Sequence, residues 1–379
     1  MAIDNKDKKI LNVPHLRFPE FSGEWEMVSL QDIATINPKS DPLQNTFIYI
    51  DLEAVEKGEL RKIQEIMREE APSRAQRVID NNDILFQCVR PYQKNNYIHR
   101  ILNTSNQQWV ASTGYAQIRT TELPNYIYHL LNTDEFNRKV MVRCTGSSYP
   151  AINSEDLATI HLYYTPDKKE QLKISRLLDL LDKRIATQNK IIEKLQSLIK
   201  GLRVCCMQRV YGNNVYLSEI AQIYQPQTIS STELTEDGFL VYGANGIIGK
   251  YKDYNHETEQ ICITCRGNTC GMVNYTKPMS WITGNAMVIN TDKYQDKVCK
   301  RYLYHYLSAY NFNSIISGSV QPQIVRTPLE KLKITLPTIS EQKQKAIIFD
   351  KIQDKIDINH KVLNLYIGQK QYLLRQMFI

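Results

Sequence analysis

Four short polar segments of the chain combine arginine, lysine, amide and hydroxyl side chains with glycine. Arg and Lys side chains can fork to guanine edges in a major groove and Asn and Gln to adenine edges, while hydroxyls, lysines and backbone amides suit phosphates. In the first half of the chain the candidate contact residues are Arg90, Tyr92, Gln93, Lys94 and Asn95, then Thr145, Gly146, Ser147 and Tyr149. In the second half they are Arg266, Asn268, Thr269, Ser317, Gly318, Ser319, Gln321 and Gln323. Each segment could instead be an ordinary surface loop, and that alternative stays open.

Motifs for base methylation do not occur in the sequence. An adenine methyltransferase needs a glycine-rich cofactor turn and an Asn/Asp-Pro-Pro-aromatic loop that holds a flipped base. Asn37-Pro38 and Asp41-Pro42 lack both the second proline and the aromatic residue. The stretch 243–249 has the wrong glycine spacing for a dinucleotide fingerprint and suits a turn or hairpin connection. We therefore expect neither catalytic residues nor a cofactor site in this chain.

Metal-ligating patterns are equally weak. Nuclease chemistry needs clustered carboxylates, but the candidate acids are assigned to the solvated face of a helix; they are Asp167, Glu170, Asp179 and Asp182. Cys262, Cys265 and Cys270 have no clear fourth ligand at zinc-finger spacing and favour a structural strand and turn. The seven histidines stand singly. The sequence predicts no metal site.

Length and composition narrow the class of protein. A chain of 379 residues is long enough for two or more domains. Its net charge of +7 permits nucleic-acid binding without demonstrating it. Eight scattered cysteines, with no apolar run of signal-peptide or membrane-spanning length, predict a reducing, cytoplasmic location and no membrane partner.

The elements that position the polar segments repeat once along the chain. The phrase LQDIA at 30–34 returns as LSEIA at 217–221, and YIYHLL at 126–131 returns as YLYHYL at 302–307. Glu170-Gln171 returns as Glu341-Gln342, and each pair opens a long helical stretch. Matches in one order with variable spacing indicate a duplicated domain and an approximate two-fold axis.

Both long helical stretches carry a heptad pattern of apolar residues, which predicts a coiled-coil seam. The predicted seam positions are Leu178, Leu181, Ile185, Gln188, Ile192, Leu195 and Ile199, then Phe349, Ile352, Ile356, Asn359, Leu363, Tyr366 and Leu373. A helix of roughly 35 residues extends about 50 Å, enough to act as a spacer. Antiparallel pairing would bring the polar Gln188 and Asn359 together near mid-helix, where they could fix the register. The alternative is two ordinary core helices in separate bundles.

Together these features resemble the specificity subunit of type I restriction-modification systems. The resemblance covers nearly the whole chain. The segments on which the resemblance rests are PHLRFPEF at 14–21 with Trp25, TGSSYPAI at 145–152, SGSVQPQI at 317–324, the two Glu-Gln helix starts and LLRQMF at 373–378.

The resemblance implies an α/β (α+β) fold with two tandem target-recognition domains separated by two long antiparallel coiled-coil helices. The expected boundaries are an arm at 1–19, recognition domains at 20–165 and 213–337, and spacer helices at 166–212 and 338–379. Each recognition domain would read one half of an asymmetric, interrupted site in double-stranded DNA. Because the polar loops differ between the repeats, the half-sites should differ.

The implied partners are two modification (methyltransferase) subunits and the restriction subunits, and the chain itself would not be an enzyme. S-adenosylmethionine, ATP and Mg would belong to those partners. Three alternatives remain: a complete single-chain methyltransferase or nuclease, a coiled-coil scaffold with protein-binding globular ends, and an unpaired, inactive specificity subunit.

Overall fold

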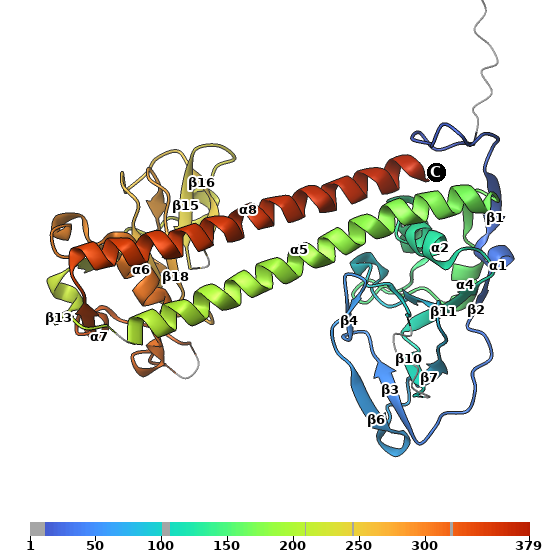
Figure 1. Cartoon of the computed structure of the whole chain (residues 1–379), viewed down its shortest axis with the longest axis horizontal. Helices are drawn as coiled ribbons and strands as arrows, with labels where there is room; N and C mark the ends of the chain where they lie inside the picture. The colour runs from blue at the N-terminus through green and yellow to red at the C-terminus, as the bar shows by residue number, and fades with distance from the viewer. Residues whose placement is uncertain (1–11, 101–106, 209, 245, 319–320) are drawn as a thin grey trace, which may run out of the picture. The chain divides into compact units, whose positions relative to one another are not determined.

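The computed structural model describes residues 12–100, 107–208, 210–244, 246–318 and 321–379, and it divides into two compact units (Figure 1). Unit 1 comprises Met1–Thr187 with Leu363–Ile379, and unit 2 comprises Gln188–Val362. Two long helices, α5 (Lys168–Gln208) and α8 (Ile339–Met377), each contribute to both units. Within the described ranges, no helix is both long and apolar enough to cross a membrane.

The globular part of unit 1, called globule 1 (residues 20–165), is built on two four-stranded sheets. One has the strand order β6-β3-β10-β7 and the other β2-β11-β8-β9. Their strands are β2 (Ala34–Ile36), β3 (Thr46–Ile50), β6 (Gln64–Met67), β7 (Ala75–Val78), β8 (Ile84–Gln87), β9 (Tyr97–Ile98), β10 (Trp109–Ser112) and β11 (Tyr115–Thr120). Two small pairs complete it: β1 (Glu26–Ser29) with β12 (His161–Tyr164), and β4 (Val55–Glu56) with β5 (Glu59–Leu60).

Four α-helices occur in the described part of globule 1, and local signals set their starts. They are α1 (Leu30–Ile33), α2 (Pro124–Leu131), α3 (Asp134–Arg143) and α4 (Ser154–Ala158). Pro124 opens α2, where its missing N–H costs no helical hydrogen bond. The side chains of Thr133 and Asn153 cap α3 and α4. The main core joins β8, β11 and α2 to the start of α5 and the end of α8, and Trp25 meets Phe378 there with ring centroids 6.0 Å apart.

Globule 2 (residues 213–337) has the same plan. Its sheets have the orders β14-β20-β17-β18, β16-β15-β19 and β13-β21. The strands are β13 (Asn213–Tyr216), β14 (Gln222–Tyr224), β15 (Phe239–Gly243), β16 (Gly246–Tyr251), β17 (Ile261–Thr264), β18 (Val273–Tyr275), β19 (Trp281–Ile282), β20 (Ala286–Asn290) and β21 (Lys333–Leu336). The helices are α6 (Lys300–Ala309) and α7 (Arg326–Glu330).

Strand pairing confirms the duplication that the sequence predicts. In globule 1, β11 lies between β2 and β8, antiparallel to both, and β10 pairs parallel to β3. In globule 2, β20 lies between β14 and β17, antiparallel to both, and β19 pairs parallel to β15. The chain therefore contains two α/β domains that share these strand pairings.

Each globule is tied to its long helix by a buried glutamine at an equivalent position. The Gln171 side-chain oxygen accepts a hydrogen bond from the N–H of Leu123, which caps α2, at 3.2 Å. The Gln342 oxygen does the same for Cys299, which caps α6, at 2.8 Å. Each glutamine also donates to a backbone oxygen ahead of its own helix. The Glu-Gln phrase therefore marks the joint between globule and helix.

A histidine and an aspartate strengthen each joint. His129 Nε2 lies 2.9 Å from Asp179 Oδ1, and His305 Nε2 lies 2.8 Å from Asp350 Oδ1. Burial lowers the pKa of His305. Although burial opposes it, hydrogen bonds from His305 and a neighbouring arginine hold the pKa of Asp350 below its usual range. Both histidine side chains are fully buried and link a globule helix to a long helix.

These joints correct the assignment of the α5 carboxylates to a solvated face. Glu170 is fully buried and accepts hydrogen bonds from Arg17 Nε at 2.7 Å and Nη2 at 2.8 Å. Asp179 meets His129, and Asp182 forms an ion pair with Lys370 at 2.5 Å. Asp167 remains exposed and accepts from the N–H of Lys169. The heptad periodicity identifies the side of α5 that faces α8. It does not show that a second side of α5 packs against globule 1.

The long helices pair antiparallel in each unit. In unit 1, Asp182 meets Lys370 and Arg184 meets Tyr366. In unit 2, Ile199, Phe349 and Ile356 form a buried cluster. The predicted seam residues that are buried are Leu178, Leu181, Gln188, Ile192, Ile199, Phe349, Ile356 and Leu373. Those that are half-buried are Ile185, Leu195, Ile352, Asn359, Leu363 and Tyr366.

His99 in globule 1 offers a test of the packing. Its side chain is fully buried beside Trp109, with ring centroids 4.9 Å apart, and neither ring nitrogen has a hydrogen-bond partner among the described residues. Burial lowers the pKa of His99 to about 4. The folded protein therefore holds His99 neutral in a pH range where the unfolded chain binds a proton.

Acidification should destabilise globule 1 through His99. Since the folded pKa lies below the ordinary 6.5, stability is full above pH 6.5 and falls as the pH drops toward 4. Between pH 7.5 and pH 5 the loss should be about 2 kcal/mol. His99→Phe should remove this part of the pH dependence in urea denaturation, whereas His360→Gln, on the exposed side of α8, should leave it unchanged. Equal slopes for wild type and His99→Phe would contradict the assignment.

The polar pair in the seam supports a second test. Gln188 Nε2 donates to Asn359 Oδ1 at 2.5 Å and to its backbone oxygen at 3.2 Å. Gln188→Leu alone leaves the partly buried Asn359 Oδ1 without its hydrogen-bond donor and should lower the free energy of unfolding by about 1–2 kcal/mol. The double variant Gln188→Leu with Asn359→Leu should cost less than the sum of the single changes, while analytical ultracentrifugation detects altered association. Strict additivity with no change in association would mean that the pair is incidental.

Candidate nucleic-acid interface

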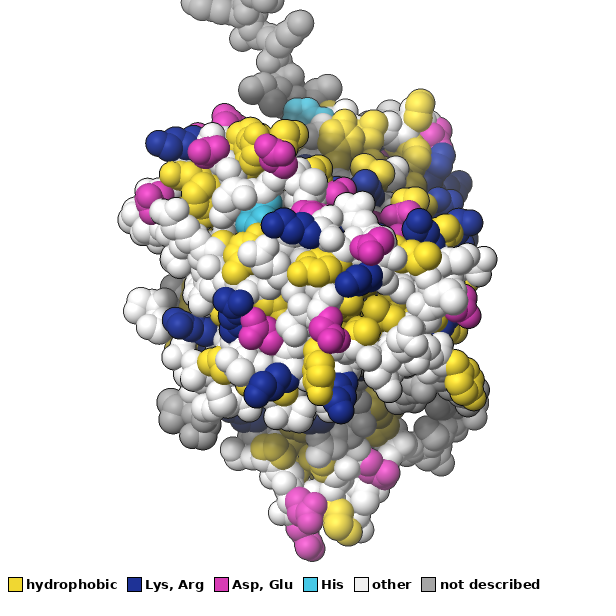
Figure 2. Space-filling model, turned by 90° about the vertical axis from the view of Figure 1, so that its left-hand side faces the viewer, with side chains coloured by type: hydrophobic (Ala, Val, Ile, Leu, Met, Phe, Trp, Pro, Cys, Tyr) yellow, Lys and Arg dark blue, Asp and Glu magenta, His cyan; other side chains and the backbone are white. Residues whose placement is uncertain are grey.

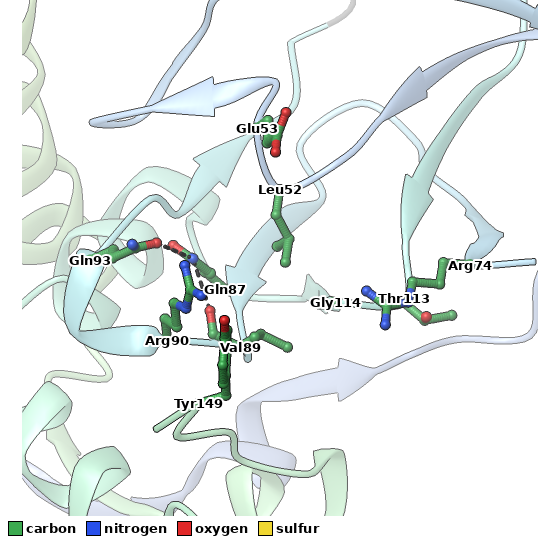
Figure 3. A pocket seen from close by; sticks show the side chains of 10 residues that line it. All are labelled: Leu52, Glu53, Arg74, Gln87, Val89, Arg90, Gln93, Thr113, Gly114 and Tyr149. Atoms are coloured by element: carbon green, nitrogen blue, oxygen red, sulfur yellow. Dashed lines mark hydrogen bonds between the residues drawn. The ribbon is translucent and has the colours of Figure 1, made fainter. Parts of the chain in front are cut away.

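A cleft of about 770 Å³, called cleft 1, opens on globule 1 (Figure 3). It is lined by Leu52, Glu53, Arg74, Gln87, Val89, Arg90, Gln93, Thr113, Gly114 and Tyr149. Arg90 and Tyr149 lie side by side on one side, and Arg74 and Thr113 lie on the other. The lining offers two guanidinium groups, two amides and one carboxylate, which are groups that hydrogen-bond to base edges and phosphates.

A buried glutamine shapes the loop that forms one wall of cleft 1. Gln87 ends strand β8 and donates from Nε2 to the Val89 backbone oxygen and to Gln93 Oε1, both at 2.9 Å. Its Oε1 accepts from the N–H of Asn95 at 3.1 Å. Its own N–H donates to Asn96 Oδ1 at 2.8 Å. Because the Gln93 oxygen is occupied, the NH₂ group of Gln93 is the part that can serve a ligand.

Arg90 has an uncommon backbone conformation for its residue type. Its φ and ψ are 54° and 54°, in the left-handed region, which costs a residue with a Cβ about 1–2 kcal/mol. The guanidinium carbon lies 4.3 Å from the centroid of the Tyr149 ring, a cation–π contact. Within the described residues, no carboxylate pairs with Arg90. The side chain is therefore held by an aromatic ring and keeps its N–H donors.

Other predicted contact residues of this segment do not join the cleft. Lys94 forms an ion pair with Asp134 at 2.7 Å. Asn95 Oδ1 accepts from the N–H of Lys57 at 3.0 Å, which ties it to the β4-β5 pair. Tyr92 is 51% exposed but does not line the cleft. The structure thus brings together Arg90, Gln93 and Tyr149, and leaves the others apart.

The second predicted segment of globule 1 is a narrow exposed loop. Thr145 and Ala151 exchange two backbone hydrogen bonds of 2.9 Å each. Gly146 between them has φ +89°, and Thr145, Gly146, Ser147 and Tyr149 are all exposed. The loop delivers Tyr149 to the cleft wall.

Globule 2 has a smaller cleft of about 350 Å³, called cleft 2, beside the corresponding pair of loops. It is lined by Tyr224, Gln225, Cys265, Arg266, Met287, Gln323, Ile324, Val325 and Arg326. Arg266 and Gln323 are the predicted residues that reach it. Asn268, Ser317, Gly318 and Gln321 are exposed outside its lining, and Thr269 is half-buried. Ser319 lies outside the described residues.

The two loop pairs share one backbone hydrogen-bond pattern. The Arg90 N–H donates to the Pro150 oxygen at 2.8 Å, as the Gly267 N–H donates to the Pro322 oxygen at 2.9 Å. Ile152 donates to Cys88 at 3.1 Å, as Ile324 donates to Cys265 at 3.0 Å. Ser317 and Gln323 exchange two bonds, as Thr145 and Ala151 do. Arg90 therefore corresponds to Gly267, and Tyr149 corresponds to Gln321.

Sequence motifs do not identify several of the residues that line the clefts. In cleft 1 these are Glu53, Arg74 and Gln87, and in cleft 2 Tyr224, Gln225 and Arg326. Gln87 carries a usable signal, because it is a polar residue at the end of an apolar strand. Glu53 and Arg74 lie in loops, and these loops reach cleft 1 only because of the order of the strands in the two sheets. Arg326 is paired with Glu330 at 2.6 Å.

The cysteines of globule 2 have a structural environment. Cys262 lies in β17, and burial raises its pKa to about 12, which keeps the thiol protonated. Burial also raises the pKa of Cys265 and of Cys270. In the described part of the chain no group of three or more His, Cys, Asp or Glu side chains could hold a metal ion.

Surface charge alone does not mark a binding track on the face drawn in Figure 2. Lys and Arg side chains are interspersed there with Asp, Glu and apolar side chains. On that face, binding of a polyanion would depend on individual Lys and Arg side chains rather than on a continuous basic surface.

The two globules and most of both long helices match a known family. Residues 22–197 and 213–365 match the type I restriction modification DNA specificity domain in two copies. The chain belongs to this family. Each specificity-domain copy thus contains a globule with the cleft described above and part of a long helix.

Individual relatives agree with the family assignment. The chain is 31% identical over 147 residues to the EcoprrI type I restriction enzyme specificity subunit of Escherichia coli, a match that covers 38% of this chain and 36% of that protein. The matched part is thus little more than a third of the relative's length. Among solved structures, the S subunit of a type I restriction-modification system from M. genitalium aligns with a TM-score of 0.65 and 16% identity, over 97% of this chain and 99% of that chain.

A second solved structure, described as the basis of complex assembly and conformational transition of the type I R-M system, aligns with a TM-score of 0.57. Its identity is 20%, over 92% of this chain and 96% of that chain. At such identities these likenesses establish the fold of the specificity subunit.

The glycines of the specificity-domain loops should not tolerate a side chain. A Cβ at Gly318 would lie 2.5 Å from the Gln321 oxygen, and one at Gly146 would lie 2.9 Å from the Tyr149 oxygen. Since both glycines have positive φ, Gly146→Ala should cost about 1–3 kcal/mol and Gly318→Ala more. Hydrogen exchange of residues 145–152 and 317–324 measures the loosening, with exposed Ser147→Ala as the control. Equal protection in all variants would show that the loops can relax.

Proposed function

We propose that this chain is the DNA-reading subunit of a type I restriction-modification enzyme and that each globule reads one half of a bipartite, asymmetric site. The observation that carries the proposal is the repeated loop pattern with different side chains. One backbone arrangement presents Arg90 and Tyr149 in globule 1 and Gly267 and Gln321 in globule 2. The same backbone arrangement with different side chains suits the recognition of two different base sequences.

The chemistry of the clefts supports direct readout. Arginine bonds in paired fashion to guanine, and glutamine bonds to adenine, in the major groove. Cleft 1 contains Arg74 and Arg90 with Gln93, and cleft 2 contains Arg266 with Gln323. Each cleft therefore offers both kinds of donor in its own arrangement.

We assign the gap between the half-sites to the length of α5 and α8. Each helix is continuous, and both contribute to both units. Half-site spacing in DNA-binding proteins follows the geometry of the element that joins the reading heads. Adding or removing whole helical turns in both helices should change the gap without changing the half-sites.

The duplication also suggests the partners. Two quasi-equivalent globule–helix joints, at Gln171 and Gln342, would provide two equivalent docking regions for two modification subunits. Restriction subunits would join the complex through the modification subunits. Methylation and cleavage, with S-adenosylmethionine, ATP and Mg, would then belong to the partners, and this chain would be non-catalytic.

The decisive experiment maps methylated adenines. The chain is co-expressed with a type I modification subunit, and the host DNA is read by single-molecule sequencing. We expect a two-part asymmetric motif that disappears when this chain is deleted. A methylation map that is unchanged by the deletion would contradict the proposal and favour a scaffold or an inactive specificity subunit.

Salt dependence separates the DNA-binding and scaffold alternatives. A DNA-reading subunit releases counterions from phosphates, so the logarithm of its affinity should fall linearly with the logarithm of salt concentration. A protein-binding scaffold should show no salt-dependent affinity for DNA. Fluorescence anisotropy of the full chain without partner subunits, titrated onto a labelled duplex, measures the slope.

A further inference from the structure

We propose that Arg90 reads a guanine in the half-site of globule 1, with Tyr149 as the residue that positions it, and that globule 2 makes no equivalent contact. The inference rests on the proposed DNA-reading function. It names one base type, one side chain and one half-site, which the proposed function does not.

The backbone at Arg90 is the first observation. Its φ of 54° lies in the region that favours glycine, and the equivalent residue of globule 2 is a glycine with φ +86°. The loop pattern therefore does not need a side chain here. An arginine that occupies a glycine-favouring position is explained by what its side chain contacts.

The surroundings of the guanidinium are the second observation. Arg90 lies over the Tyr149 ring at 4.3 Å, in a cleft that also holds the amide of Gln93. Among the described residues no acid forms an ion pair with it. A ring contact restrains the planar group while its N–H fork stays available, which is the geometry that bonds to O6 and N7 of guanine. Tyr149 is 64% exposed, so the restrained group lies at the surface and can be reached.

Lys94 provides an internal comparison. It also has positive φ, 52°, and the corresponding position of globule 2 is Gly271 with φ +90°. Its ammonium group, however, forms an ion pair with Asp134 at 2.7 Å and contacts the Asn132 oxygen. A structural partner accounts for Lys94, whereas the structure offers Arg90 no such partner among the residues it describes.

Globule 2 lacks both members of the Arg90 and Tyr149 pair. Gly267 has no side chain, and Gln321 has no ring on which a cation could rest. Its arginine at the cleft, Arg266, precedes the glycine and pairs through its backbone with Gln323. The guanine contact at this loop position is therefore specific to one half-site.

The test maps methylated adenines for the complex of this chain with its modification subunit, using Arg90→Gly, Arg90→Lys and the control Lys94→Gly. Arg90→Gly copies the residue of globule 2 and suits the backbone, so the complex should remain assembled. We expect the motif of globule 1 to lose its preference for guanine at one position, with discrimination reduced about 5- to 150-fold. The other half-site and the gap should not change.

Arg90→Lys separates base reading from phosphate binding. Lysine keeps the charge but not the fork, so a base contact should lose much of its discrimination and a phosphate contact should keep its affinity. Tyr149→Phe, which retains the ring, should preserve the motif, and Tyr149→Gln should relax it at the same position as Arg90→Gly. Lys94→Gly should leave the motif intact.

Two results would overturn the inference while leaving the proposed function in place. One is an unchanged motif for Arg90→Gly. The other is a uniform loss of affinity on all duplexes with a salt slope reduced by about one, which identifies a phosphate contact. If the wild-type chain directs no motif at all, the proposed function fails instead.

Discussion

Each long helix must satisfy two interfaces at once, and the rest of the structure depends on this constraint. One side of α5 or α8 forms the apolar seam, and another side lies under a globule through buried polar contacts. Gln171 and Gln342 hold the caps of α2 and α6, while His129 and His305 meet aspartates on the helices. Because a buried polar group without a partner is costly, such contacts fix how each globule sits on its own helix.

The duplication preserves backbone contacts and varies side chains. The hydrogen bonds that hold the loops of cleft 1 and cleft 2 join backbone N–H and C=O groups, which every residue but proline can supply. Arg90 and Gly267 can therefore occupy one position in the two copies at the price of backbone strain in one of them. A frame of this kind allows the reading surface to change without a change of fold.

The sequence predicts the repeated elements and the seam better than the clefts. Heptad spacing reports which residues face the partner helix, and an ion pair between Lys370 and Asp182 also joins the two helices. The same spacing carries no information about the globule side of α5, and for that reason it wrongly predicts that Glu170 and Asp179 face solvent. Glu53 and Arg74 could not be placed, because their approach to Arg90 depends on the order of strands in two sheets.

Residue type alone also overestimates the contact surface. Lys94 and Asn95 have the chemistry of DNA contacts, yet their polar groups are used to hold the loop against α3 and the β4-β5 pair. Arg90, three positions before Gln93, has the same type of charge but has an aromatic ring in place of an acid beside it. Whether a basic side chain can serve a ligand is thus decided by its neighbours across the fold. In globule 1 the polar residues that are already paired support the loop, and Arg90, which has no acid beside it, is available for recognition.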